Sequence, residues 1–304
     1  MEIIYLKGQK IKFDKPICTA LGFFDGLHIG HMALVNEVKR VAKEKGYKSA
    51  LMTFDHHPLY ILGKINEEKV LTTMRDRKNI LEKEKIDYLF VIEFTKEVAS
   101  LSPQDFMQKY LIDNHIKHVV CGFDFKFGRM NSGDTQTLLN STEFHVSVVD
   151  EIIYEGEKVS SSRLRKLMGK GNIEDINALL GRHYCITGEV VGGRRIGHTI
   201  GFPTANINYA SYYLPQNGVY AVKVYIDDDC YLGMCNIGYN PTFVSLDKPS
   251  LEVYIFDFHK DIYGKEVVVE FYKKTRDEVT FASKEQLIEQ LHKDQEEILN
   301  YYKN

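Results

Sequence analysis

The chain has 304 residues, of which 44% are hydrophobic and 27% charged, a composition typical of a globular protein with a sizeable core. Acidic and basic residues are mixed along it and the net charge is −3, which gives no electrostatic support for broad nucleic-acid binding. The sequence contains neither a long apolar run nor the basic-then-apolar layout of a signal peptide, so we expect a cytoplasmic protein without a membrane partner.

The first half of the chain alternates short apolar runs with helical patterns. Apolar residues three and four apart from Leu34 to Ala42 predict a helix that ends near Gly46, and two more helices are predicted at 75–85 and Pro103–Asp113. Strands are predicted at Ile17–Leu21, Ala50–Phe54, Tyr88–Ile92, His118–Cys121 and Phe144–Val149. This alternation indicates an α/β fold, a doubly wound parallel sheet that binds ligands at the carboxyl ends of its strands.

The pattern changes after a helical stretch that ends at Gly181. Strands are then predicted at Tyr184–Val191, Gly218–Ile226, Tyr231–Ile237, Leu251–Phe258 and Val267–Tyr272. Short antiparallel strands of this kind suit a small closed β-barrel, and apolar residues from Leu287 to Leu299 predict a final amphipathic helix. No flexible linker composition separates the two halves, so we expect two abutting domains, 1–181 and 182–304.

The segment Gly22–His31 follows a predicted strand and opens a predicted helix. Its glycines let backbone N–H groups approach a phosphate, and a helix N-terminus attracts anions. The two histidines can face one ligand and donate to phosphate oxygens as charge builds in the transition state. A solvated pair of histidines on a turn is the alternative, but the strand-to-helix position favours a functional site. We predict ATP contacts and catalysis here from Gly22, Asp25, His28, Gly30 and His31.

A second polar cluster, Val159–Arg165, stands at the start of another predicted helix. Serines commonly cap helices, which alone would explain one of its three. Three hydroxyls with two arginines also make an anion cradle. Combined with a His-x-Gly-His segment after a strand, this cluster resembles the nucleotidyltransferase superfamily, whose members transfer adenylyl groups from ATP.

Further motifs in the first half narrow this resemblance. They are Thr53-Phe54-x-x-His57-Pro58, Leu71-Thr72-Thr73, Gly122–Gly128 and Gly133-Asp134, and they resemble those of the bacterial bifunctional riboflavin kinase/FAD synthetase family. The resemblance implies a Rossmann-like FMN adenylyltransferase domain that makes FAD from FMN and ATP. On matching positions, Ser161, Ser162 and Arg165 join His28 and His31 at the ATP phosphates. The same matching places His57, Pro58 and Asp124 toward the flavin and adenine.

The second half carries another candidate nucleotide segment, Gly201–Asn206, preceded by the glycine-rich stretch 192–197. Glycine-rich backbone can wrap a polyphosphate, while hydroxyl and carboxamide oxygens suit Mg²⁺. The segment is not a Walker A motif, and an ordinary Gly/Pro turn between strands is the alternative. We predict nucleotide contacts from Gly193, Gly197, Gly201 and Pro203.

The motifs that follow are similar, in the same order, to the riboflavin kinase module of that bifunctional family. They are Gly218-Val219-Tyr220, Asn236-Ile237-Gly238-x-x-Pro241-Thr242-Phe243, Leu251-Glu252-Val253, Asp257-Phe258, Tyr263-Gly264, Arg276 and Phe281. The resemblance therefore covers nearly the whole chain and implies that the barrel makes FMN from riboflavin and ATP. By the family pattern, Thr204 and Asn206 coordinate Mg²⁺ and Glu252 is the base for the ribityl 5′-hydroxyl. The sequence agrees in part, because Glu252 is a carboxylate on an apolar strand.

Three positions depart from the family pattern. His56 stands where a Pro-His-Pro motif usually begins, which we expect to loosen that loop and add a titratable group. His198 and Asn240 stand where the family often carries arginine, which removes two cations near the second phosphate site. Arg194 and Arg195 are candidates to replace them.

Four readings of the function remain open from the sequence. The first is a bifunctional enzyme that makes FMN and then FAD, with riboflavin, FMN and ATP as its small-molecule partners. The others keep one activity only, act as a non-catalytic flavin-binding regulator, or adenylylate another phosphate ester. The catalytic residues His28, Thr204 and Glu252 argue against a pure binding module, which needs no base. Five cysteines without a C-x-x-C pair favour reduced thiols over a zinc site or disulfides.

Overall fold

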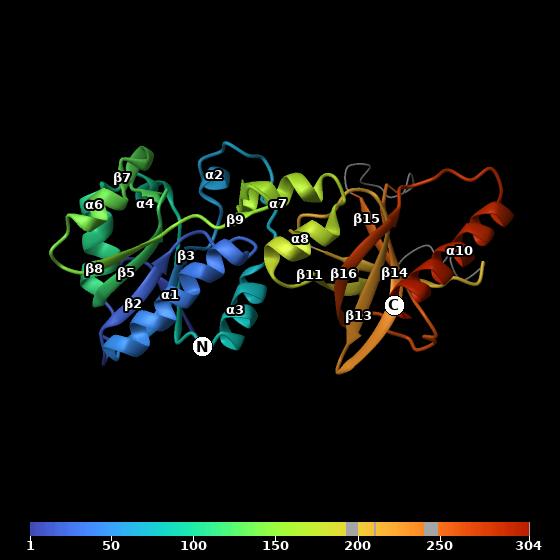
Figure 1. The fold of residues 1–304 in the computed structure, drawn as a ribbon, viewed down its shortest axis with the longest axis horizontal. Helices are drawn as coiled ribbons and strands as arrows, with labels where there is room; N and C mark the ends of the chain where they lie inside the picture. Colours follow the sequence, from blue (N-terminus) through green and yellow to red (C-terminus); the bar gives the residue numbers. More distant parts are fainter. Residues whose placement is uncertain (193–199, 210, 240–248, 304) are drawn as a thin grey trace. The chain divides into compact units, whose positions relative to one another are not determined.

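A computed structural model of the protein describes residues 1–192, 200–209, 211–239 and 249–303 (Figure 1). The chain divides into two compact units, Met1–Ser161 and Ser162–Asn304. Helix α8 (Ile173–Leu180) therefore groups with the second unit, ahead of the 181/182 boundary expected from the sequence. That functional boundary stays a prediction.

A six-stranded parallel sheet forms the centre of the first unit. Its strands, in spatial order, are β1 (Glu2–Leu6), β4 (Tyr88–Ile92), β3 (Lys48–Phe54), β2 (Ile17–Leu21), β5 (Ile116–Gly122) and β8 (His145–Val149). The chain runs from β2 outward through β3 to β4 and then returns to place β5 on the other side of β2. The order thus reverses next to β2, and in such sheets ligands bind outside the carboxyl ends at this point.

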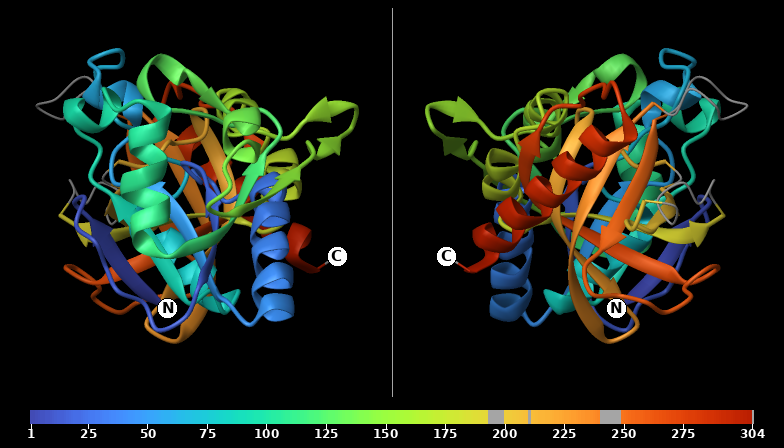
Figure 2. Two further views of the ribbon diagram at one scale, coloured as in Figure 1. Left: turned by 90° about the vertical axis from the view of Figure 1, so that its left-hand side faces the viewer. Right: turned by 90° about the vertical axis from the view of Figure 1, so that its right-hand side faces the viewer.

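Helices cover both faces of this sheet because alternate strand residues feed two separate apolar clusters. On one face, Leu51 and Val91 pack with α1 (Ile29–Lys45) and with Leu81 of α3 (Met74–Lys83). On the other face, Met52 and Phe90 pack with the helical segment 103–114 (Figure 2, left). That segment consists of α5 (Pro103–Phe106), a π-helix (Met107–Leu111) and a 3₁₀ turn (Ile112–Asn114).

The first unit also contains several short helices and strands. The helices are α2 (Pro58–Ile61), α4 (Lys96–Ala99), the 3₁₀ turn Arg129–Asn131 and α6 (Thr135–Leu139). Two small antiparallel pairs join β6 (Lys126–Phe127) to β7 (Gly133–Asp134), and β9 (Ile153–Tyr154) to β10 (Glu157–Lys158).

The second unit is a closed six-stranded antiparallel barrel with helices α7 (Ser161–Met168), α8 and α10 (Lys284–Lys303). Around the barrel the strands are β11 (Tyr184–Val191), β12 (Thr204–Asn208), β15 (Ser250–Ile255), β14 (Asp229–Gly238), β13 (Gly218–Ile226) and β16 (Glu266–Arg276). Residues such as Leu251 and Val253 are buried in its interior. Their alternating neighbours face outward, where α10 lies across the strands (Figure 2, right).

The predicted fold class is confirmed in both halves: a parallel α/β unit followed by an antiparallel barrel and a C-terminal helix. Strands β1 and β12 were not predicted from the sequence, and the pattern over Pro103–Asp113 predicted one regular helix. The backbone there passes through α, π and 3₁₀ geometry instead.

Candidate active sites

The loop after β2 is held in an unusual backbone conformation. Phe24 and Leu27 have φ values of +55° and +42°, in the left-handed region that is costly for residues with a side chain. Both side chains are nearly completely buried in the cluster under α1. The core therefore fixes this loop, which ends at His28 where α1 begins.

Two histidines at the start of α1 form a compact donor pair. Nδ1 of His28 accepts a hydrogen bond from the backbone N–H of His31 at 3.2 Å, so the proton of a neutral His28 lies on Nε2. The two rings stack with centroids 3.7 Å apart. A Cβ at Gly30 would lie 3.1 Å from ring atoms of His28, which explains the glycine between them. Together with the helix N-terminus, the pair favours a bound anion.

A buried ion pair supports this loop. Arg77 of α3 is 3% exposed and Asp25 is 1% exposed, with Nη2 of Arg77 3.7 Å from Oδ1 of Asp25. Nη1 of Arg77 donates to the carbonyl oxygen of Phe23 at 3.0 Å. Oδ1 of Asp25 accepts the backbone N–H groups of Leu71 and Thr72, so this predicted phosphate contact faces protein backbone. Arg77 was not predicted from the sequence, because a cation in a charged helical pattern is usually solvated.

The serine-rich segment meets the same loop. Oγ of Ser161 donates to the carbonyl oxygen of Asp25 at 2.8 Å, and the carbonyl of Val159 would lie 3.7 Å from a Cβ at Gly30. Within the first unit, the structure therefore brings Ser161 to the loop that carries His28. Ser162 and Arg165 follow on α7 in the second unit, and their contact with ATP stays a prediction.

A largely apolar cavity of about 490 Å³ lies next to this loop in the first unit. Gly22 and Phe23 of the loop form part of its wall, as do the predicted flavin-side residues Pro58 and Asp124. Much of the remaining wall is aromatic or aliphatic: Met52, Phe54, Ile92, Phe94, Phe106 and Phe127. An apolar cavity beside an anion-binding helix start suits a flat aromatic molecule that carries a phosphate.

The third predicted flavin-side residue, His57, lies against this wall. Its ring packs edge-on against Phe23 with centroids 4.8 Å apart. Its Nδ1 accepts the backbone N–H of Leu59, 3.1 Å away, and so caps α2. Because His57 contacts two residues of the cavity wall, it can influence the shape of the cavity from outside.

A lysine forms an ion pair with Asp124 at the same cavity. Lys158 of β10 forms an ion pair with Asp124, and its Nζ lies 4.5 Å from the ring centroid of Phe123. The Asp124 loop is also joined to β8 through a hydrogen bond from the N–H of Phe123 to the carbonyl of Val149. Lys158 was not predicted from the sequence, since no motif marks the short hairpin that carries it.

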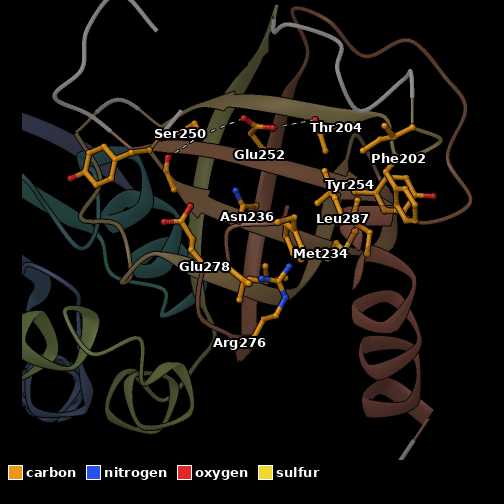
Figure 3. Close-up of a pocket in the computed structure, with 17 residues that line it drawn as sticks. Phe202, Thr204, Met234, Asn236, Ser250, Glu252, Tyr254, Arg276, Glu278 and Leu287 are labelled. Carbon is orange, nitrogen blue, oxygen red and sulfur yellow. Dashed lines mark hydrogen bonds between the residues drawn. The ribbon is translucent and has the colours of Figure 1, made fainter. Parts of the chain in front are cut away.

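In the barrel, polar side chains gather around Glu252 on β15. Neighbouring strands pair Asn206 of β12 with Glu252, and Glu252 with Asn236 of β14. Oγ1 of Thr204 donates to one carboxylate oxygen of Glu252 at 3.3 Å, and Oγ of Ser250 lies 3.4 Å from the other (Figure 3). Residues opposite each other on adjacent strands share a face, so these groups form one polar row outside the barrel interior.

Two cavities share Thr204. One, of about 340 Å³, contains Glu252 together with apolar and aromatic side chains, among them Phe202, Tyr254 and Leu287 of α10 (Figure 3). The other, of about 410 Å³, is lined by Pro203 and the segment 258–263, which includes His259 and Lys260. The predicted nucleotide segment therefore lines both cavities, through Phe202 in the cavity of Glu252 and through Pro203 in the other, and Thr204 lines both.

Part of the predicted nucleotide segment falls outside the described residues. This applies to Gly193, Gly197 and the departures His198 and Asn240. Gly201 is described, with a φ of +84° that favours glycine. Asn206 is half-buried on the same strand face as Thr204, two residues away.

The wall of the Glu252 cavity is anchored by an ion pair between a half-buried arginine and a buried aspartate. Arg276 at the end of β16 lines that cavity, and its guanidinium makes hydrogen bonds of 2.7 to 3.0 Å to Asp294 of α10. Asp294 is 2% exposed and also accepts a hydrogen bond from Gln290. This pair joins α10 to the barrel, so it helps to fix the helix that supplies Leu287 and Leu291 to the cavity.

Neither a membrane span nor a cluster of typical metal ligands is found in the described parts of the chain. No helix there combines the length and apolarity that crossing a membrane requires. Likewise, those residues contain no group of three or more His, Cys, Asp or Glu side chains able to hold a metal ion. All five cysteines lie within the described ranges, and none of them forms a disulfide.

Comparisons with known proteins match both units. Residues 10–163 match the family model described as FAD synthetase, and residues 180–302 match the one described as riboflavin kinase. The bifunctional riboflavin kinase/FMN adenylyltransferase of Listeria monocytogenes is 41% identical, over 93% of this chain and 91% of its own. The Bacillus subtilis protein of the same description is 40% identical, over 94% and 92%.

The architecture also matches a solved structure over its full length. A crystal structure described as a macrolide-efflux protein from Streptococcus pneumoniae is 32% identical, with a TM-score of 0.90. The match covers 98% of this chain and 99% of that one. The combination of an α/β unit and a barrel is therefore shared along the whole chain.

Proposed function

The chain belongs to the bifunctional riboflavin kinase/FMN adenylyltransferase family, and from this premise we propose that the barrel makes FMN and the α/β unit converts it to FAD. The enzyme phosphorylates riboflavin with one ATP and adenylylates FMN with a second, releasing pyrophosphate. The assignment of one activity to each unit is supported by the observation that each unit contains a candidate site of its own. One contains the His28/His31 pair beside an apolar cavity, and the other contains Glu252 in a cavity that shares Thr204 with a second cavity.

In the kinase step, Glu252 is the general base. The cavity that contains it has the apolar and aromatic lining that a flavin ring needs, while the adjoining cavity at Pro203 offers a place for the nucleotide. Glu252 takes the proton of the ribityl 5′-hydroxyl as that oxygen attacks the γ-phosphorus of ATP, and ADP leaves. Hydrogen bonds from Thr204 and Ser250 orient the carboxylate for this task.

Mg²⁺ fits the barrel site as a companion of ATP. Thr204 and Asn206 offer neutral oxygens from one face of β12, and such oxygens suit a hard cation that arrives with phosphate charge. When bound, the ion would neutralise charge that develops on the transferred phosphate. The glycine-rich segment that includes Gly193, Gly197 and Gly201 would then surround the polyphosphate.

In the adenylylation step, a phosphate oxygen of FMN attacks the α-phosphorus of ATP and pyrophosphate leaves. The donor pair His28 and His31 stabilises the negative charge that builds on the phosphates, helped by the N-terminus of α1. The flavin ring occupies the apolar cavity between Pro58 and Asp124. Ser161, which donates to the Asp25 carbonyl within the first unit, completes this part of the ATP site, and contact of Ser162 and Arg165 with ATP is what the family resemblance implies.

Asp25 and Arg77 serve this step by holding the loop, which differs from the direct phosphate contact expected of Asp25. A carboxylate repels phosphate, and the Asp25 carboxylate already accepts two backbone hydrogen bonds. Arg77 restrains the Phe23 carbonyl that precedes it. The pair is therefore a support for His28 rather than a ligand of ATP.

Incubation of the purified protein with riboflavin, ATP and Mg²⁺, followed by separation of flavins, tests this function. FMN should appear first and FAD after it. FMN without FAD, or FAD only from added FMN, would leave a single activity. Retention of flavin without turnover would identify a binding protein. We also place the enzyme in the cytoplasm, where ATP is available and thiols such as the buried Cys18 and Cys235 stay reduced.

A further inference from the structure

One carboxylate holds two neighbouring histidines after β3. Oε2 of Glu68 lies 2.7 Å from Nδ1 of His56, and Oε1 of Glu68 accepts the backbone N–H of His57. The Glu68 side chain is 17% exposed, whereas His56 is 51% exposed. Glu68 follows His56 by 12 positions in the chain, so this contact closes the segment that contains α2.

The same turn is anchored on its other side. Oδ1 of Asp55 accepts the backbone N–H groups of His56 and Phe94, each at 2.8 Å. Phe94 follows β4 and lines the apolar cavity. Asp55 and Glu68 together therefore fix a three-residue turn between the sheet and the start of α2.

This turn leads directly into one wall of the apolar cavity. Pro58, Leu59 and Leu62 follow immediately and line it, and the ring of His57 packs against Phe23, which also lines the cavity. A displacement of the turn would therefore move the Pro58–Leu62 wall and remove a contact of Phe23. The sequence led us to expect a loosened loop at His56, where related proteins usually have proline, but Glu68 restrains the loop instead.

We propose that His56 and Glu68 form a clasp that positions the Pro58–Leu62 wall for the flavin ring and thereby sets the affinity of the adenylylation step for FMN. This inference rests on the proposed function of the cavity as the flavin site. In the clasp a side-chain ion pair provides the restraint that a proline ring would otherwise impose on the backbone. His56 and Glu68 are positioning residues, since both act through the turn.

The clasp depends on pH in a definite direction. The charged groups that face His56 are Glu68 and Asp55, and the Tyr60 ring lies with its centroid 6.3 Å away. The hydrogen bond to Glu68 raises the pKa of His56 above its ordinary value of 6.5, against a smaller lowering by burial. The ion pair is therefore complete below pH 6.5 and is lost as pH rises through the raised pKa. The KM for FMN should increase over that rise.

The test is steady-state kinetics of the full chain, with FMN varied in the adenylylation assay and riboflavin phosphorylation as the internal reference. Glu68→Ala and His56→Ala should each raise the KM for FMN about 2- to 5-fold, the range expected of an exposed ion pair, with kcat nearly unchanged. Both should abolish the pH dependence of that KM. Glu67→Ala is the matched control, because it removes the same charge one residue away and should change neither.

His56→Pro provides the rescue arm. It should raise the KM less than His56→Ala does, because proline restrains the turn, but it should also remove the pH dependence. If Glu68→Ala lowers the yield of folded protein, the His56 variants and the Kd for FMN from flavin fluorescence answer the same question.

Two outcomes would overturn the clasp, and a third separates it from the proposed function. Equal KM values for Glu68→Ala and Glu67→Ala, or a fall in kcat at constant KM, would show that the clasp does not set FMN affinity. Leu62→Arg places a charge in the cavity wall itself and should raise the KM strongly. If Leu62→Arg leaves the KM for FMN unchanged, the cavity is not the flavin site and the proposed function of the cavity fails. If Leu62→Arg raises this KM but the His56 and Glu68 variants do not, only the clasp proposal fails.

Discussion

Arg77→Met is the sharpest perturbation of the loop that carries His28. Methionine is close to arginine in length, so the change removes the guanidinium while leaving an apolar stem on α3. Asp25 then keeps its hydrogen bonds from Leu71 and Thr72 but loses the buried cation 3.7 Å away. Removing one partner of a buried pair typically costs about 3–5 kcal/mol. The Phe23 carbonyl retains the Thr53 hydroxyl as a donor, which favours the lower end, about 3 kcal/mol.

The functional consequence should be confined to FAD formation. Loss of about 3 kcal/mol of stabilisation from this loop would displace His28 from the phosphates. Misplacement by about 1 Å can cost roughly 10²-fold in rate. We therefore expect adenylylation to fall by about that factor and riboflavin phosphorylation to stay unchanged, with an earlier first transition in urea unfolding. Arg75→Met, an exposed position on the same helix, should alter neither activity. An adenylylation rate within a few-fold of the original, in a variant of unchanged stability, would refute the role given to Arg77.

Two further predictions concern the barrel. Thr204→Ala should impair phosphorylation more than riboflavin binding. Calorimetry should find no tight Mg²⁺ binding without nucleotide, because Thr204 and Asn206 offer only neutral oxygens. Tight binding of Mg²⁺ to the free protein would contradict this site. A fragment 162–304 should fold and make FMN but no FAD, whereas 183–304 should be less stable, because it lacks α8 with its buried Ile173, Ile176 and Leu179. Equal stability of the two fragments by circular dichroism would show that α8 is dispensable.

Much of the fold was predictable because buried strands and amphipathic helices leave regular patterns. Ile17–Leu21, with all five residues buried, reads as a strand from composition alone. By contrast, β12 has the sequence Thr-Ala-Asn-Ile-Asn, in which only Ile207 is fully buried, so its strand character comes from pairing with β11 and β15. The π-helix at Met107–Leu111 has no local sequence signal that we recognise.

The candidate sites were predictable where a motif carries them and not where tertiary packing does. The pairing of His28 with His31 follows from their spacing and from the helix start. Arg77 and Lys158 reach their partners across long stretches of chain, so no local pattern reveals them. His56 illustrates the opposite error: its departure from the family's Pro-His-Pro motif suggested a loosened loop, whereas Glu68, twelve residues on, supplies a restraint.

Product analysis of two complementary variants tests the central claim, that the chain contains two separate active sites. Glu252→Gln should lower FMN formation from riboflavin by ~10²–10⁴-fold, the range for a positioned general base, and leave conversion of added FMN to FAD nearly intact. His28→Ala should do the reverse, so that riboflavin and ATP yield FMN that accumulates without becoming FAD. Loss of both activities in either folded variant, or a kinase rate within a few-fold of the original in Glu252→Gln, would contradict the account.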